Sequence, residues 1–233
     1  MKFKTELHCH TCEVSRCASE NAADTAEKYI KYGYSTIVLT NHLSAFSFNE
    51  EMRERSWKEK IDFFIDGYEA VKKAANGRLN ILLSAEIRFR ENQNDYLLLG
   101  IDPDFLYGHE NFYDMSVGQF YPNCIYPDYL LIQAHPFRHN MTVTPPYFID
   151  GWEVYNGHPT QNSHNDAAEV YANHYPNKHK VSGSDHHDAD HFPAGGIMTD
   201  FEINTNEELL KVIRSGEYTL IKEEDIRLGN KRL

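Results

Sequence analysis

Histidine and acidic side chains follow the apolar core of five predicted strands. The residues in this pattern are His8, His10, His42, Glu86, His135, Asp185 and His187. Imidazole nitrogens and carboxylate oxygens, without thiolate, are ligands that suit Zn, Mn or Fe. One such strand end would be a chance occurrence, whereas five that meet at one place form a site. The sequence therefore predicts a metal centre assembled from segments that lie far apart along the chain.

The spacing within two of these segments supports shared metal ligation. In an extended chain residues i and i+2 point the same way, so His8 and His10 are expected to bind one ion together. The same rule pairs Asp185 with His187. These ligands are too many for one tetrahedral ion, but a bridging Glu86 would let two or three ions, about 3.5–4 Å apart, share them. We therefore expect two or three divalent ions of Zn, Mn or Fe.

Short apolar runs alternate with helical stretches and position these residues. The predicted strands are 3–7, 36–40, 81–85, 96–100, 129–133, 152–155, 180–182 and 218–222. The predicted helices are 22–32, 55–76, 163–174 and 205–214. This alternation is typical of an α/β fold with a mainly parallel sheet covered by helices. The alternatives are an open doubly wound sheet and a closed barrel. Because no G-x-G-x-x-G follows the first strand, which weakens the nucleotide-binding alternative, we favour a barrel in a single domain, 1–233, with its site at the C-terminal mouth.

The composition limits the classes of function. The 233 residues include 35 acidic and 23 basic side chains, a net charge of −12, which disfavours extended nucleic-acid binding. A small phosphorylated substrate stays compatible, because bound cations reverse the charge of a site locally. No stretch approaches the roughly 20 apolar residues of a membrane span, and the first residues lack the apolar run of a signal peptide. We expect a cytoplasmic protein without membrane contact; its oligomeric state is left open.

Three of the four cysteines, Cys9, Cys12 and Cys17, lie within nine residues. This spacing is too tight for a disulfide framework in a chain of this size and indicates reduced thiols. Cys9 and Cys12 form a C-x-x-C pattern, but a redox motif of this kind normally opens a helix after a strand and needs no histidine cluster elsewhere. A thiol-redox function is therefore a less favoured alternative.

The segments that carry these side chains resemble the motifs of the PHP family, named for polymerase and histidinol phosphatase. ELHCHT at 6–11 is similar to the first motif and TNH at 40–42 to the second. Glu86 and AHP at 134–136 are similar to the third motif, and GSDHH at 183–187 to the fourth. They follow the family order and span nearly the whole chain. The resemblance implies a distorted (β/α)7 barrel, a two- or three-metal centre and hydrolysis of phosphoesters.

The resemblance also implies how the ligands are shared. One ion would be held by His8, His10, Glu86 and Asp185, a second by Glu86 and His135, and a third by His42 and His187. Where the family usually has a further Asp or His ligand after the first motif, this chain has residues 13–17, which offer Cys17 or Glu13. Where the family often has a histidine that completes the second site, Asp102 is the possible substitute.

The predicted reaction is attack on phosphorus by a metal-activated hydroxide, most simply on a small phosphomonoester. Arginine is suited to hold the phosphoryl oxygens in bidentate fashion. The candidates are Arg88, two residues beyond Glu86, and Arg138, three beyond His135, with Arg16 third. Specificity is expected from the loops that follow the strands, chiefly 44–55, 103–127 and 156–163.

Two further functions stay open. The first is a phosphodiesterase or exonuclease that acts on short oligonucleotides, which the resemblance permits but the charge of −12 disfavours. The second is a non-catalytic metal-binding scaffold, against which the near-complete ligand set argues. Turnover on phosphoesters with metal present distinguishes the scaffold from both enzymes.

Overall fold

The strands of the computed structural model, which describes residues 2–125 and 127–223, form two sheets. The five-stranded sheet has the order β11-β10-β1-β2-β4 and consists of β1 (Phe3–Cys9), β2 (Thr36–Leu39), β4 (Asn80–Leu83), β10 (Ile197–Thr199) and β11 (Thr219–Leu220). The six-stranded sheet has the order β3-β5-β6-β7-β8-β9 and consists of β3 (His42–Ser44), β5 (Ala85–Arg88), β6 (Asp95–Leu99), β7 (Leu130–Gln133), β8 (Gly151–Asn156) and β9 (His179–Gly183). The fold is therefore mixed α/β.

The strand directions differ from the expected mainly parallel arrangement at two places. β1, β2 and β4 are parallel neighbours, as are β3 and β5, and β7, β8 and β9. β6 is antiparallel to both β5 and β7, and β10 is antiparallel to β1 and β11. The connection from β5 to β6, residues 89–94, is too short for the crossover of a dozen or more residues that parallel strands require. The sheets are therefore mixed.

The two sheets meet at two points. β4 and β5 belong to different sheets although Ser84 alone separates them in sequence. On the other side, His186 forms an isolated parallel bridge with Cys9 and brings the segment after β9 against β1. Among the described residues, strand pairing around a closed ring, which the predicted barrel requires, is not shown.

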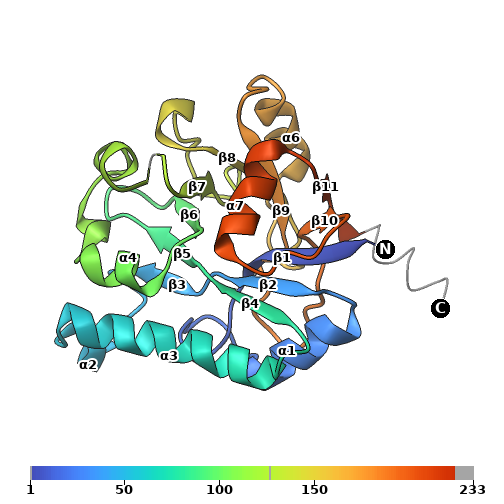
Figure 1. The fold of residues 1–233 in the computed structure, drawn as a ribbon. Coiled ribbons are helices and arrows are strands. Elements are labelled where there is room, and N and C mark those ends of the chain that lie inside the picture. The colour runs from blue at the N-terminus through green and yellow to red at the C-terminus, as the bar shows by residue number, and fades with distance from the viewer. Residues whose placement is uncertain (1, 126, 224–233) are drawn as a thin grey trace.

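The longer helices cover the outside of the sheets. α1 (Ala22–Lys31) and α3 (Trp57–Ala75) lie side by side below β2 and β4 in Figure 1. Ser56 and Glu59 form a reciprocal capping box that starts α3. The other helical segments are α2 (Glu50–Arg53), α4 (Pro103–Gly108), α5 (Val117–Phe120), α6 (Asn165–Ala172), α7 (Asn206–Ser215), the short turns Phe112–Asp114 and Pro146–Phe148, and the π-turn Tyr121–Ile125. The four predicted helices are present with shifted ends.

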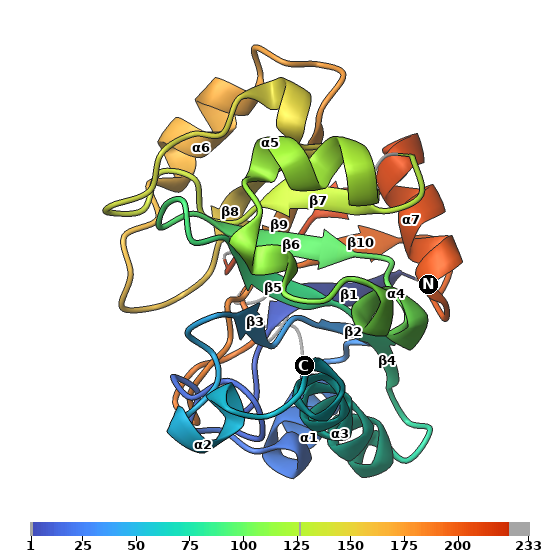
Figure 2. The same ribbon diagram turned by 90° about the vertical axis from the view of Figure 1, so that its left-hand side faces the viewer.

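A core of aliphatic side chains fills the space between the sheets. Leu7 of β1, Val38 of β2 and Ile132 of β7 belong to one buried cluster with Leu209 and Ile213 of α7. Thr205 caps α7, and its carboxyl-terminal turn ends at Gly216 in a left-handed conformation. In Figure 2, α7 and the amino terminus lie at the right, whereas β3 lies at the left, with the loops that follow β1 and β9. One end of the sheets is thus covered by α7, and the other is free to form a site.

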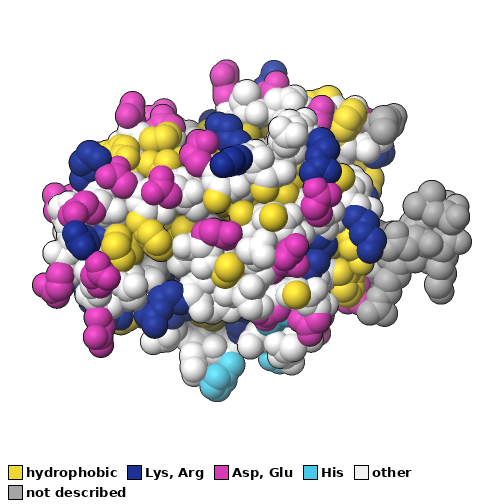
Figure 3. Space-filling view, turned by 90° about the horizontal axis from the view of Figure 1, so that it is seen from below, with side chains coloured by type: hydrophobic (Ala, Val, Ile, Leu, Met, Phe, Trp, Pro, Cys, Tyr) yellow, Lys and Arg dark blue, Asp and Glu magenta, His cyan; other side chains and the backbone are white. Residues whose placement is uncertain are grey.

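Charged side chains of both signs are interspersed over the face shown in Figure 3, and histidines emerge at its lower edge. No helix in the described parts of the chain is long and apolar enough to cross a bilayer.

Candidate metal centre

The carboxylate of Glu86 is the meeting point of four predicted histidines. Its Oε1 lies 3.3 Å from Nε2 of His8 and 3.1 Å from Nε2 of His135. Its Oε2 lies 3.3 Å from Nε2 of His10 and 2.9 Å from Nδ1 of His42. The positions of Glu86 and His42 follow from the parallel pairing of β3 with β5, in which these two residues are direct partners. Two short strands that the sequence did not predict therefore place these two groups.

Asp185 supplies a second buried carboxylate to the same cluster. Its Oδ1 lies 3.3 Å from Nε2 of His8, 3.5 Å from Nε2 of His10 and 3.4 Å from Nδ1 of His187. Asp185 has a φ of 53°, so it lacks the extended backbone assumed for its predicted pairing with His187. His135 also has a positive φ, of 28°. A left-handed backbone at a residue other than glycine costs about 1–3 kcal/mol and is concentrated at functional sites. All seven predicted ligand residues nevertheless come together.

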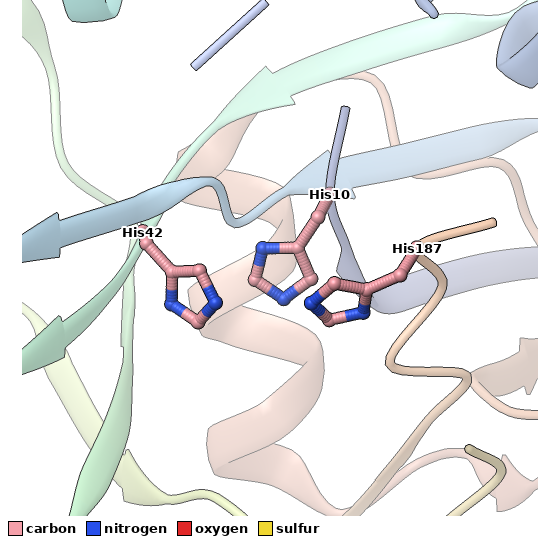
Figure 4. Close-up of side chains that lie close together, drawn as sticks. All are labelled: His10, His42 and His187. Carbon is pink, nitrogen blue, oxygen red and sulfur yellow. The ribbon is translucent and has the colours of Figure 1, made fainter. Parts of the chain in front are cut away.

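Three of the histidines also lie close to one another within the cluster. His10 follows β1, His42 begins β3 and His187 lies in the segment after β9, and their rings face one another in Figure 4. The ring of His10 is centred 4.4 Å from that of His42 and 4.3 Å from that of His187. One nitrogen from each ring lies within 4.8 Å of the others. Three imidazoles at this separation can share one ion.

Cys17 lies beside this group of three histidines, whereas Glu13 does not. Burial raises the pKa of the Cys17 thiol, but hydrogen bonds with His187 and His42 outweigh burial and lower that pKa to about 6. The carboxylate of Glu13 instead accepts a hydrogen bond of 2.8 Å from the backbone N–H of Ala22, at the start of α1. Of the two alternatives for a further ligand, the structure brings Cys17 to the site.

Several nitrogen and oxygen atoms of the cluster that could bind a metal ion have no hydrogen-bond partner among the described residues. They are Nε2 of His8, Nε2 of His10 and Oε2 of Glu86, all of them buried. Unsatisfied polar atoms in a protein interior are costly, so a group of them at one place calls for a partner. Atoms from His8, Glu86 and His135, from His8, His10 and Asp185, and from His10, His42 and His187 lie within 4.8 Å of one another in each set. These donor sets fit divalent metal ions.

The electrostatics of the cluster keep its carboxylates ionised. Burial raises the pKa of Glu86, but the charges of His8 and His42 and a hydrogen bond from His135 bring that pKa well below its ordinary value. The pKa of Asp185 is likewise well below its ordinary value, because His8 and other neighbours outweigh the effect of burial. Both carboxylates are therefore in the anionic form that binds a cation.

Glu153, in β8, supports two of the histidines and was not predicted as a site residue. Its Oε1 lies 2.9 Å from Nδ1 of His8, which leaves Nε2 of that ring facing Glu86. Its Oε2 accepts hydrogen bonds from the backbone N–H of His135, at 3.0 Å, and from Asn156, at 2.9 Å. A carboxylate on the far nitrogen orients a ligating imidazole. The available signal was an acidic residue within a buried apolar strand, which needs a partner.

Glu6 ties the first predicted motif to the fourth. Its Oε1 accepts hydrogen bonds of 2.9 Å from the backbone N–H groups of Leu7, His8 and Ser184. Its Oε2 accepts hydrogen bonds from the hydroxyls of Tyr29 and Ser184. Burial raises the pKa of Glu6 and these hydrogen bonds oppose the rise. The segment that bears His8 is thereby held against the segment that bears Asp185.

The two arginines predicted to hold the phosphoryl group are each paired with a carboxylate. Arg138 Nη2 lies 2.7 Å from Oδ2 of Asp185 and donates to Asn156 at 2.8 Å. Arg88 donates two hydrogen bonds of 2.6 Å to Asp95, its direct partner across β5 and β6. This geometry favours a positioning role for both arginines, Arg138 at a ligand residue and Arg88 at the edge of the cluster.

Asp102, the possible substitute ligand at the second site, lies away from the cluster. Because β6 is antiparallel to its neighbours, the residues that follow it leave at the opposite end of the sheet from Glu86. Asp102 there caps α4, where its side chain accepts a hydrogen bond of 2.8 Å from the N–H of Phe105. Asp95, at the start of β6, lies at the cluster instead, with Oδ2 3.9 Å from Nε2 of His135.

Two adjoining cavities open beside the cluster. One, of about 200 Å³, is lined by residues that include Arg16, Cys17, His42 and Glu86. The other, of about 310 Å³, shares Cys17, His42 and Glu86 and also reaches Arg138, His158 and Asp185. The cluster is therefore buried on one side and open to small molecules on the other.

The C-x-x-C pattern has no redox geometry. Cys9 is fully buried, and burial raises its pKa well above the ordinary value of a thiol. Cys12 is exposed, and all four cysteines are free. A buried thiol with a raised pKa is a poor nucleophile, so the structure does not favour thiol-redox chemistry here.

No family model and no curated protein sequence matches this chain. Solved structures do match it. A two-domain protein from Bacteroides vulgatus, described as containing a predicted PHP-like metal-dependent phosphoesterase, matches with a TM-score of 0.64 and 12% identity, over 95% of this chain and 65% of that one. A proposed metal-dependent phosphoesterase from Bifidobacterium adolescentis matches with a TM-score of 0.53 and 12% identity, over 91% of this chain and 96% of that one.

An amidohydrolase from Chromobacterium violaceum has a similar fold. It matches with a TM-score of 0.55 and 11% identity, over 93% of this chain and 97% of that one. At these identities the likenesses show a shared fold. The chain thus has the fold of PHP-like metal-dependent phosphoesterases, in agreement with the resemblance of its motifs.

Proposed function

We propose that this chain is a metal-dependent phosphoesterase of the PHP family, with that family's distorted (β/α)7 barrel, and that it hydrolyses a small phosphomonoester. The observation that carries the proposal is the convergence of five histidines, from four separate segments, on the carboxylates of Glu86 and Asp185. Divalent ions held there would lower the pKa of a water molecule and neutralise the charge that develops on phosphoryl oxygens.

The proposed ligands divide among two or three ions of Zn, Mn or Fe. The first set is His8, His10, Glu86 and Asp185, the second is Glu86 and His135, and the third is His42 and His187, which also lie close to His10. Cys17, which interacts with His42 and His187, is the proposed further ligand of the third set. Glu86 can serve the first and the second set, because its Oε1 lies close to both His8 and His135 while its Oε2 lies close to His10.

The remaining residues position the ligands and define the substrate. Glu153 orients His8, and Arg138 holds Asp185 through its second oxygen. The two cavities beside the cluster are of a size for a small phosphoester. The net charge of −12 repels an extended polyanion, which favours a monoester over an oligonucleotide.

The test is a phosphoester panel with metal-loaded protein, for which we expect turnover of phosphomonoesters that a chelator abolishes. A matched pair is p-nitrophenyl phosphate and its bis-p-nitrophenyl diester. Higher kcat/KM for the diester, or for short oligonucleotides, would favour the phosphodiesterase alternative. Full metal content without turnover on any ester would overturn the catalytic proposal and favour the non-catalytic scaffold.

A further inference from the structure

The proposed function leaves the negative charge of the substrate without a cationic side chain. A phosphomonoester carries close to two negative charges at neutral pH, since its second pKa is about 6. Arg88 and Arg138 line the cavities, but Asp95 and Asp185 already neutralise them. A third arginine, Arg16, lines the cavity of about 200 Å³ that His42 and Glu86 also border.

Arg16 differs from the other two arginines in its surroundings. It is exposed, and it makes no hydrogen bond or ion pair with any residue in the described ranges. The two other arginines of the cavities each hold a carboxylate at 2.6–2.7 Å. Arg16 is therefore the arginine in these cavities whose guanidinium is available to an anion.

The backbone around Arg16 is held firmly although its side chain is free. Ser15, directly before it, is fully buried, and its hydroxyl accepts a hydrogen bond of 3.0 Å from the N–H of His42. The same hydroxyl donates to Asn41 at 2.8 Å. Backbone hydrogen bonds from Ser15 to Thr11 and from Ala18 to Ser15 close the turn. The turn thus presents Arg16 at a defined place next to the candidate ligands.

We propose that Arg16 binds the phosphoryl group of the substrate and selects a dianionic phosphomonoester over a monoanionic diester. The guanidinium has a planar fork of donors that matches two phosphoryl oxygens, and the group it binds lies in the cavity shared with His42 and Glu86. This proposal rests on the proposed function, because it concerns the substrate of the same site.

The selectivity follows from charge. A dianionic monoester gains more from a nearby unpaired cation than a diester with one negative charge. Loss of Arg16 should therefore weaken binding of monoesters and of inorganic phosphate, the dianionic product, more than binding of diesters.

The experiment compares wild type, Arg16→Ala and Arg16→Gln as metal-loaded proteins, with Arg78→Ala as the control. Arg78 is exposed and is paired with Glu27. Because Arg78 is also an arginine, its replacement changes the net charge by the same amount as replacement of Arg16. We expect the Arg16 variants to lose about 10- to 100-fold in kcat/KM for p-nitrophenyl phosphate, the range of a charge-assisted hydrogen bond. The inhibition constant of inorganic phosphate should rise similarly, and kcat/KM for the diester should fall less.

The proposal is overturned if both Arg16 variants, with wild-type metal content, stay within about twofold of Arg78→Ala in kcat/KM for the monoester and in phosphate inhibition. An equal loss for monoester and diester would overturn the selectivity. If wild type turns over no phosphoester, the proposed function fails, and calorimetric titration of the metal-loaded proteins with inorganic phosphate still decides about Arg16. Weaker binding in the variants then supports the anion site, and unchanged or absent binding refutes it.

Discussion

The candidate metal centre has an inner half, His8 and His135, and an outer half, His42, His187 and Cys17. In the inner half the histidine side chains are 0% and 2% exposed, and Glu153 contacts both residues. In the outer half the side chains of His42 and His187 are 27% and 11% exposed, and Cys17 is exposed. Both halves touch the carboxylate pair of Glu86 and Asp185.

The two halves differ in the support of their ligands and in their position relative to the cavities. The inner half is oriented by buried hydrogen bonds, and such support raises ligand basicity and metal affinity. The outer half borders both cavities and the unpaired Arg16, whereas the inner half reaches the larger cavity through His135. We therefore expect inner ions to be retained most firmly and an outer ion to exchange most readily, on the side where the substrate enters.

Glu86→Gln should produce the largest effect, because the side chain serves both halves. An amide keeps the shape but removes the negative charge that faces four histidines. We expect loss of the tightly bound ions and a fall in kcat/KM of at least about 1,000-fold. Elemental analysis after desalting measures the loss of ions, and steady-state kinetics measure the fall in kcat/KM. Glu51→Gln, on the exposed surface, is the matched control, and retention of all ions by Glu86→Gln would show that the carboxylate does not bridge.

Glu153→Gln should affect the inner half alone, with a smaller effect. The amide cannot accept from both His8 and the backbone of His135 with the strength of a carboxylate. Removing such a support costs about 10- to 100-fold in metal affinity. Competition with a graded series of chelators measures this loss. If the weakened ion is the one that Cys17 contacts, the division into two halves is wrong.

Cys17→Ser should affect the outer half alone and cause the smallest change, the weakening of a single ion. With cobalt as the probe metal, we expect a near-ultraviolet sulfur-to-cobalt charge-transfer band in wild type that is absent in Cys17→Ser. Cys12→Ser, which changes an exposed thiol of the same segment, should keep the band. A wild-type protein fully loaded with cobalt but without this band would exclude Cys17 as a ligand.

The grouping of the site residues could be predicted from the sequence because it depends on a local signal. Most of these residues lie at or just beyond the carboxyl end of a parallel strand, such as β1 or β9, and such ends share one edge of a fold. Glu153 carried a signal as well, since an acid within the buried strand β8 needs a partner.

The arginine pairs and the acidic neighbour of His135 could not be predicted, because they depend on strand direction and register. Asp95 lies at the site because β6 is antiparallel, and the same reversal carries Asp102 away. Arg88 faces Asp95 because the two residues are opposite each other in the β5–β6 ladder. No pattern within a single segment reports which residue of another strand lies opposite.

The measurement that tests the central claim most directly is the number of ions per chain and the order in which a chelator removes them. We predict two or three ions of Zn, Mn or Fe per chain, with one lost first and the rest retained until stronger chelation. Release of the first ion should be faster in Cys17→Ser and unchanged in Glu153→Gln. One ion or none after reloading with excess metal would contradict the shared centre, and simultaneous release of all ions would contradict the difference between its halves.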